Sequence, residues 1–109
     1  MGPKMYVLVR KDLSRSQQTV QASHAVAQYL LSFPGSPKKL GWDNGIMVVL
    51  AAEDEADLKT WFHMICMDGI DVQYFEDQFP SKAQPEWTAI CAIDRDSELE
   101  LMFHKLVLI

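Results

Sequence analysis

Four uncharged polar side chains recur at helical spacing in the first third of the sequence. Gln17, Gln21, His24 and Gln28 follow one another at intervals of three or four residues, so on a helix they form a single line. Exposed helix faces normally mix Lys and Glu, whereas these amides and this imidazole suit the recognition of hydroxyls, amides or bases. His24 could also serve as a general base or donor. The alternative is a solvated face on which glutamines align by chance.

An acidic pair, Glu76 and Asp77, forms a second candidate where a predicted strand gives way to a loop. Ligand sites in α/β folds collect at strand ends, and a carboxylate there can orient water or bind a hydroxyl. Such pairs also cap turns or face solvent. Ser81 lies in the same loop, but no neighbouring base supports a serine nucleophile. Without a phosphate-binding glycine motif or clustered histidines, we expect no cofactor and no metal.

The elements that must position these residues alternate between strands and helices. Short apolar runs predict strands at residues 6–9, 46–51, 72–75, 87–93 and 106–109. The first is expected to be buried on both faces. This alternation predicts an α/β fold, a three-layer sandwich with a mixed four- to five-stranded sheet and helices on both faces.

Helical periodicity predicts one helix over residues 17–32, capped by Ser14 or Ser16. Its expected inward stripe is Ala22, Val26, Tyr29, Leu30 and Phe33. A second helix, capped by Asp54, is expected to reach Met67, and a short third helix follows Ser97 as its cap. The expected inward residues of the second helix are Ala56, Trp61, Ile65 and Leu58.

Composition limits the class of protein. The 109 residues are 49% hydrophobic and 23% charged, which is typical of one globular domain, here residues 1–109 with Met5 as a candidate natural start. The sequence shows no signal peptide and no apolar run of about 20 residues, so we expect neither a secreted nor a membrane protein. Two isolated cysteines, Cys66 and Cys91, favour a reducing compartment, and we expect the cytoplasm.

Charge is unevenly distributed along the chain. Residues 1–42 carry six basic residues against Asp12 alone, a net +5, while residues 43–109 carry four basic and fourteen acidic residues, a net −10. This polarisation predicts a positive face for a polyanion, although chance clustering of solvated charge would give the same sequence. The overall charge of −5 argues against general coating of nucleic acid but allows a local phosphate contact.

The order of motifs resembles the second type of peptidyl-tRNA hydrolase. Residues 9–13 read V-R-K-D-L, similar to the family's V-R-x-D-L. Residues 21–25 read Q-A-S-H-A, similar to the end of the family's G-K-x-A-A-Q-x-S-H-A. The combination of these two motifs, in this order, is the most specific part of the resemblance.

The likeness continues along the chain. Residues 52–58, A-E-D-E-A-D-L, are similar to the family's A-P-D-E-x-x-L. It extends through G-I-D-V at residues 69–72, a strand ending in Asp77, and T-A-I-C-A-I at residues 88–93. The resemblance therefore covers about residues 4–109.

The resemblance implies hydrolysis of the ester between a peptide and the 3′ ribose of tRNA. The family's proposed working residues are a lysine entering the first helix, an aspartate ending the third strand and a threonine four residues later. The aspartate falls on Asp77 and the threonine on Ser81, which keeps a hydroxyl. Gln17 stands at the lysine position, and Phe79 and Pro80 replace the family's Gly-Arg.

Under this resemblance, Asp77 orients or activates water and Ser81 holds a substrate oxygen. Gln21 and His24 position the ribose or the peptide, and Gln17 can donate a hydrogen bond without bringing charge. The alternative is a non-catalytic relative of the same fold that binds tRNA, another RNA or a protein partner.

The expected binding partner is the acceptor end of tRNA, contacted by basic residues of the N-terminal part. These residues are Arg10, Lys11 and Arg15, with Lys38 and Lys39 at the rim. Arg15, or else Lys11, is expected to supply the cation missing at Gln17. Members of the family often form dimers, and the apolar residues 106–109 are a candidate edge for a homodimer.

Overall fold

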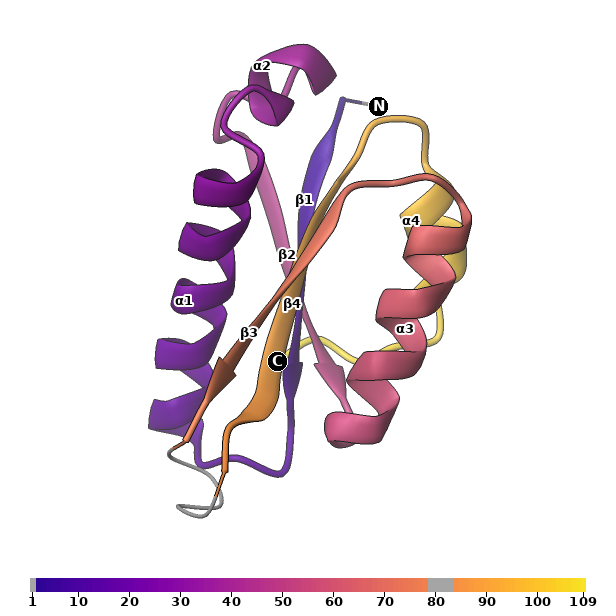
Figure 1. The fold of residues 1–109 in the computed structure, drawn as a ribbon. Helices are drawn as coiled ribbons and strands as arrows, with labels where there is room; N and C mark the ends of the chain where they lie inside the picture. Colours follow the sequence, from indigo (N-terminus) through magenta and orange to yellow (C-terminus); the bar gives the residue numbers. More distant parts are fainter. Residues whose placement is uncertain (1, 79–83) are drawn as a thin grey trace.

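Four strands form one mixed sheet in the order β2-β1-β4-β3, with helices on both faces (Figure 1). The computed structural model describes residues 2–78 and 84–109. The elements in chain order are β1 (Lys4–Arg10), α1 (Arg15–Ser32), α2 (Ser36–Leu40), β2 (Ile46–Ala52), α3 (Glu55–Met67), β3 (Val72–Asp77), β4 (Glu86–Asp94) and α4 (Glu98–Met102). This arrangement confirms the predicted α/β sandwich.

Strand β1 lies at the centre of the sheet. It pairs in parallel with β2 and antiparallel with β4, and six of its seven residues are buried. Because side chains alternate along a strand, Tyr6 and Leu8 pack with α3 and α4, while Val7 and Val9 pack with α1. The predicted burial on both faces is confirmed.

Strand β2 consists entirely of hydrophobic residues, yet it lies at one edge of the sheet. Ile46 and Met47 are each 43% exposed. The predicted strand at residues 106–109 is reduced to an isolated antiparallel bridge between Leu50 and Leu108, flanked by backbone hydrogen bonds of 2.8 and 3.1 Å. The sheet therefore has four strands, with this short segment alongside β2.

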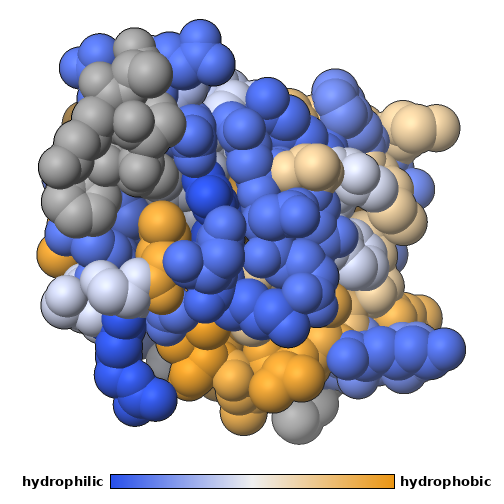
Figure 2. Space-filling model, turned by 90° about the horizontal axis from the view of Figure 1, so that it is seen from below, coloured by the Kyte–Doolittle hydropathy of each residue, from blue (hydrophilic) through white to orange (hydrophobic). Residues whose placement is uncertain are grey.

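An apolar groove of about 470 Å³ separates α1 from the β2 edge. Its lining residues are Val7, Gln18, Thr19, Ala22, Ser23, Val26, Met47, Val49 and Ile109. Figure 2 shows hydrophobic side chains gathered along one margin of an otherwise hydrophilic surface. In the segment beside β2, Val107 and Leu108 are 72% and 69% exposed.

The helix caps agree with the sequence at two places and differ at a third. Ser14 and Asp54 each accept a hydrogen bond from a backbone N–H in the first turn of α1 and α3. Ser97 holds the N-cap position of α4 with a φ of 67°, but its hydroxyl makes no cap bond. Asp94 caps this helix instead, accepting two backbone N–H groups at 3.1 Å. Helix α2 was not among the predicted elements, and Pro37 fits its first turn.

The buried face of α1 is rotated from the predicted stripe. Its fully buried residues are Gln21, Ala25 and Tyr29. Leu30 is 36% exposed, while Ala22, Val26 and Phe33 pack at the edge of the core. On α3, Leu58 and Ile65 are buried as predicted, but Ala56 is exposed. Gln21 is a polar residue on the buried face of α1, and the sheet supplies a hydrogen-bond partner for its side-chain amide.

The carboxyl ends of β1, β2 and β3 meet at one end of the molecule, the lower end in Figure 1. Helices α1 and α3 begin at the same end. We call this region the carboxyl end of the sheet. It brings the end of β3 and the first turns of α1 together, which is where ligands bind in many α/β folds.

Candidate active site

A hydrogen-bond relay joins α1 to the neighbouring ends of β3 and β4. Thr88 Oγ1 donates to Gln21 Oε1 at 2.8 Å. Gln21 Nε2 donates to Asp77 Oδ2 at 2.9 Å and to Gln17 Oε1 at 3.1 Å. Thr88 is fully buried and Gln21 is 1% exposed. The amide of Gln21 is therefore locked in one orientation and holds the Asp77 carboxylate against α1.

A β-bulge brings Thr88 into this relay. The ladder pairs Phe75 with Ala89 and Glu76 with Trp87, so Thr88 is an extra residue in β4. Strict alternation from Ala89, which packs on the α1 side, would turn Thr88 to the α3 side. The bulge breaks the alternation and re-aims the side chain towards α1. Sequence reasoning missed Thr88; its only signal was a hydroxyl residue inside an apolar strand.

Arg10 forms a clamp beside the relay. Its guanidinium donates two bonds of 2.9 Å to Asp12, one of 2.7 Å to Glu86, and one of 3.1 Å to the Trp87 carbonyl. These carboxylates raise the pKa of Arg10, and Arg10 lowers the pKa of Asp12 in return. The Arg10 side chain is only 9% exposed. The R-x-D motif thus links the end of β1 to the start of β4. The positive charge of Arg10 is already paired with carboxylates.

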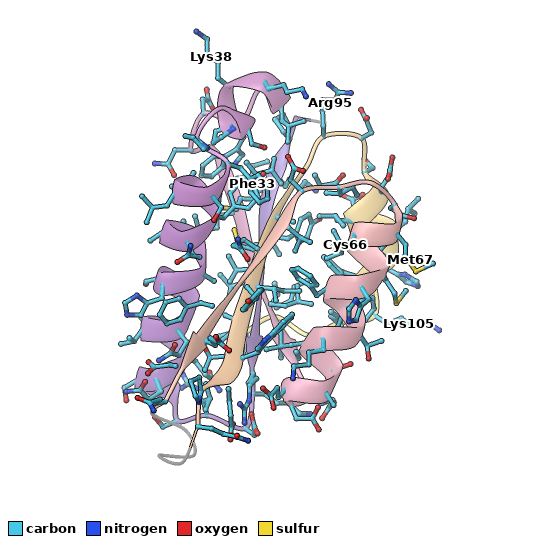
Figure 3. The ribbon with its side chains drawn as sticks, in the orientation of Figure 1. Phe33, Lys38, Cys66, Met67, Arg95 and Lys105 are labelled. Atoms are coloured by element: carbon cyan, nitrogen blue, oxygen red, sulfur yellow. The ribbon has the colours of Figure 1, made fainter. Side chains whose placement is uncertain are left out.

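The other predicted basic contacts do not form one surface. Lys11 pairs with Glu53 at 2.9 Å. Arg15 is exposed in the first turn of α1 and makes no ion pair within residues 2–78 and 84–109. Lys38 and Lys39 lie on α2, at the opposite end of the molecule from the carboxyl end of the sheet (Figure 3). The 18-residue helix α1, about 27 Å long, separates the two ends.

The remaining predicted residues fall in different places. His24 is exposed and stacks on Phe75, with ring centroids 4.5 Å apart and planes at 9°. Ser81 lies outside the described residues. The structure thus brings together Gln17, Gln21 and Asp77, adds Thr88, and leaves His24 one helical turn further along α1.

The relay can serve chemistry that needs a fixed carboxylate. An oriented carboxylate can hold a water molecule or accept a proton from it. Gln17 uses its amide oxygen to accept from Gln21, so its amide nitrogen remains a donor for a ligand oxygen. Within the described residues, no group of three or more His, Cys, Asp or Glu side chains could hold a metal ion. Nor does any described helix have the length and apolar character to cross a membrane.

Comparisons with known proteins connect this geometry to a family. The family model described as peptidyl-tRNA hydrolase PTH2 matches residues 3–109. The search of curated proteins found no match. Among solved structures, the protein of unknown function Atu0240 from Agrobacterium tumefaciens strain C58 has a TM-score of 0.66 at 12% sequence identity. The match covers 100% of this chain and 98% of that one, and at this identity it shows the fold alone.

Proposed function

Because the chain belongs to the peptidyl-tRNA hydrolase PTH2 family, we propose that it hydrolyses the ester between a peptide and the 3′ ribose of tRNA. The observation that carries the proposal is the hydrogen bond from Gln21 to Asp77, which fixes the motif-matched carboxylate. Water attacks the ester carbonyl carbon and gives its proton to Asp77. The proton then passes to the ribose 3′ oxygen as the ester bond breaks, so that free tRNA and peptide leave.

Charge on the carbonyl oxygen needs stabilisation without the family's lysine. We assign this role to the amide nitrogen of Gln17, because its amide oxygen accepts from Gln21 and its nitrogen can therefore donate to the substrate. Arg15 takes the cationic role at this end, and we assign it to a phosphate of the acceptor end. Lys11 and Arg10 are already held by carboxylates, which leaves Arg15 as the better candidate.

The neutral Gln17 also favours a second candidate function, a non-catalytic relative that binds the tRNA acceptor end. Losing one group that stabilises a developing oxyanion commonly costs 10²–10³ in rate. A protein of this kind would bind tRNA with salt-dependent affinity but show no turnover.

Release of an N-acetylated aminoacyl group from tRNA distinguishes the two functions. We expect the wild type to be active and Asp77→Asn to lose at least 100-fold in kcat. Asp71→Asn is the matched control, because Asp71 is an exposed aspartate before the other end of β3. An inactive wild type that still binds tRNA supports the non-catalytic function, and Gln17→Lys then asks whether one cation restores turnover. Full activity of Asp77→Asn contradicts the assigned role of Asp77.

We also propose that the protein works in the cytoplasm as a homodimer. The apolar groove includes Ile109 in its lining, and the preceding Val107 and Leu108 are exposed beside β2. Exposed apolar patches commonly mark contacts between proteins. The free thiols of Cys66 and Cys91 are consistent with a reducing compartment.

A further inference from the structure

An aromatic pair with one exposed ring lies beside the candidate active site and takes no part in the proposed proton transfers. His24 and Phe75 stack almost in parallel, at 9°, with their centroids 4.5 Å apart. Phe75 is half-buried and packs on the α1 side of the core. His24 is exposed, so the ring face that points away from Phe75 is open to a ligand. We call His24 and Phe75 the stacking platform.

The stacking platform lies close to the Asp77 carboxylate along both α1 and β3. His24 follows Gln21 by three residues on α1, and residues at this spacing are neighbours on a helix face, about 5–6 Å apart at Cβ. Phe75 precedes Asp77 by two residues on β3 and faces the same helix, since Gln21 of α1 bonds Asp77. A group bound on His24 therefore lies within one nucleotide's length of a group held at Asp77.

Hydrogen-bonding side chains continue beyond the platform. A shallow cavity of about 270 Å³ is lined by Gln28, Gln73, Tyr74, Phe75 and Glu76. The Gln28 and Gln73 amide nitrogens both donate to Ser32 Oγ, at 3.3 and 3.0 Å. The Gln73 amide oxygen accepts from the Tyr74 backbone N–H at 2.9 Å, so the amide oxygen of Gln28 is the acceptor offered to a ligand. An amide acceptor beside an aromatic face matches the exocyclic amine of adenine, which Gln side chains bind in nucleic-acid complexes.

From this geometry we propose that the His24–Phe75 platform stacks the 3′-terminal base of the tRNA while Asp77 acts on the ester of the same nucleotide. The inference rests on the proposed function, in either its catalytic or its binding form. Single-stranded RNA ends are recognised by stacking their bases on aromatic side chains, His and Phe included. The terminal base is adenine in every tRNA, whereas the peptide side chain next to the ester varies, so a fixed flat platform suits the base better.

The test uses an RNA hairpin that ends in CCA and the same hairpin with an abasic 3′-terminal residue. We expect the wild type to bind the CCA hairpin about tenfold more tightly than the abasic one, within the usual range for one stacked base. His24→Ala should remove this difference, and His24→Phe, which keeps a flat ring, should restore it. His63→Ala is the matched control, because His63 is an exposed histidine against Phe62 on α3, across the sheet.

Each outcome decides between the inference and the function on which it rests. If His24→Ala still discriminates tenfold between the two hairpins, the platform does not bind the base, although the hydrolase proposal stands. If His24→Phe fails as His24→Ala does, the imidazole acts through its nitrogens and stacking is wrong. If the wild type binds neither hairpin and releases no aminoacyl group, the proposed function falls and the inference falls with it. A parallel loss in Phe75→Leu, with an unchanged unfolding midpoint, would support stacking from the buried side.

Discussion

The two flanks of helix α1 border opposite edges of the same sheet and differ in almost every property. Towards β3, Gln17, Gln21 and Gln28 meet polar partners on the strand and on the helix itself. Towards β2, Ala22 and Val26 line an apolar groove. One helix thus presents fixed hydrogen-bonding groups on one side and hydrophobic surface on the other.

The difference shows how a small domain divides its tasks. Fixed dipoles around a carboxylate suit chemistry, because they need no reorganisation when charge develops. Apolar surface at a sheet edge suits contact with another protein, because covering it removes hydrocarbon from water. We therefore expect changes on the β3 flank to alter activity alone, and changes on the β2 flank to alter assembly alone.

Gln21→Met should have the largest effect, because it keeps the size of the side chain and removes every hydrogen bond of the relay. A carboxylate displaced by about 1 Å loses on the order of 100-fold in rate, and we expect this fall in kcat with no change in molecular mass. Gln21→Glu should behave differently. Its second carboxylate beside Asp77 raises the pKa of the pair, so the acid limb of the pH–rate profile should move upward. Steady-state kinetics from pH 4 to 9 measure both the fall in kcat of Gln21→Met and the shifted acid limb of Gln21→Glu.

Two substitutions of Thr88 test the same hydrogen-bond relay. Thr88→Val removes the donor to Gln21 Oε1, whereas Thr88→Ser keeps it, so the serine variant should retain the kcat that the valine variant loses. Equal loss in both would assign Thr88 to packing. A change of oligomeric state in any of these variants would break the comparison between the two flanks.

Met47→Lys should act on the other flank. It places a charge at the exposed β2 edge, which opposes both burial of the groove and strand pairing across the edge. We expect the mass from light scattering to fall from that of a dimer to about 12 kDa, with kcat unchanged. Met64→Lys is the control, since Met64 on α3 is similarly exposed, 42% against 43%. A wild type that is monomeric at all concentrations would refute the dimer.

Asp12→Asn tests whether the Arg10 clamp stabilises the fold. This contribution should be independent of the two flanks of α1. Arg10 lowers the pKa of Asp12, so the folded protein keeps this carboxylate ionised at lower pH than the unfolded chain does. The stabilisation is complete above the unfolded pKa, near 4, and is lost as the pH falls through the folded value. Because Asp12 is 43% exposed, we expect Asn to cost only about 1 kcal/mol at pH 7.

Urea unfolding at pH 7 and pH 3 checks this expectation: the difference in unfolding free energy between wild type and Asp12→Asn should be smaller at the lower pH. Asp96→Asn, which removes an exposed partner of Arg95, should leave stability unchanged at both. A gap that is the same at pH 3 as at pH 7 would show that the charge of Asp12 contributes nothing.

Local patterns in the sequence predicted much of the fold for identifiable reasons. Continuous apolar runs predicted β1 and β4, and side-chain oxygens before helical periods predicted the caps at Ser14 and Asp54. The motif order predicted the family, which the match over residues 3–109 confirms. Burial of β2 could not be predicted in this way, because an apolar strand reads the same at the edge of a sheet as at its centre.

The candidate site, like the fold, was predictable from the sequence only in part. The aspartate and the glutamines could be named from motif and spacing. Their contacts could not, because the bulge that turns Thr88 towards Gln21 depends on the pairing of two strands. The buried face of α1 was misplaced for the same reason. A glutamine is buried only where partners satisfy its amide, and sequence periodicity does not show those partners.

The charged residues show most clearly which properties follow from the sequence and which follow from the folded structure. The sequence by itself fixed the number of charges, the excess of basic residues in the first 42 positions, and the helical line that carries Gln17, Gln21 and His24. The tertiary structure decided which charges remain available. Folding brings Arg10 to Asp12 and Glu86, brings Lys11 to Glu53, and places Lys38 a helix length away from Arg15. Electrostatic interaction depends on distance in space and on exposure to solvent, and neither follows from position along the chain.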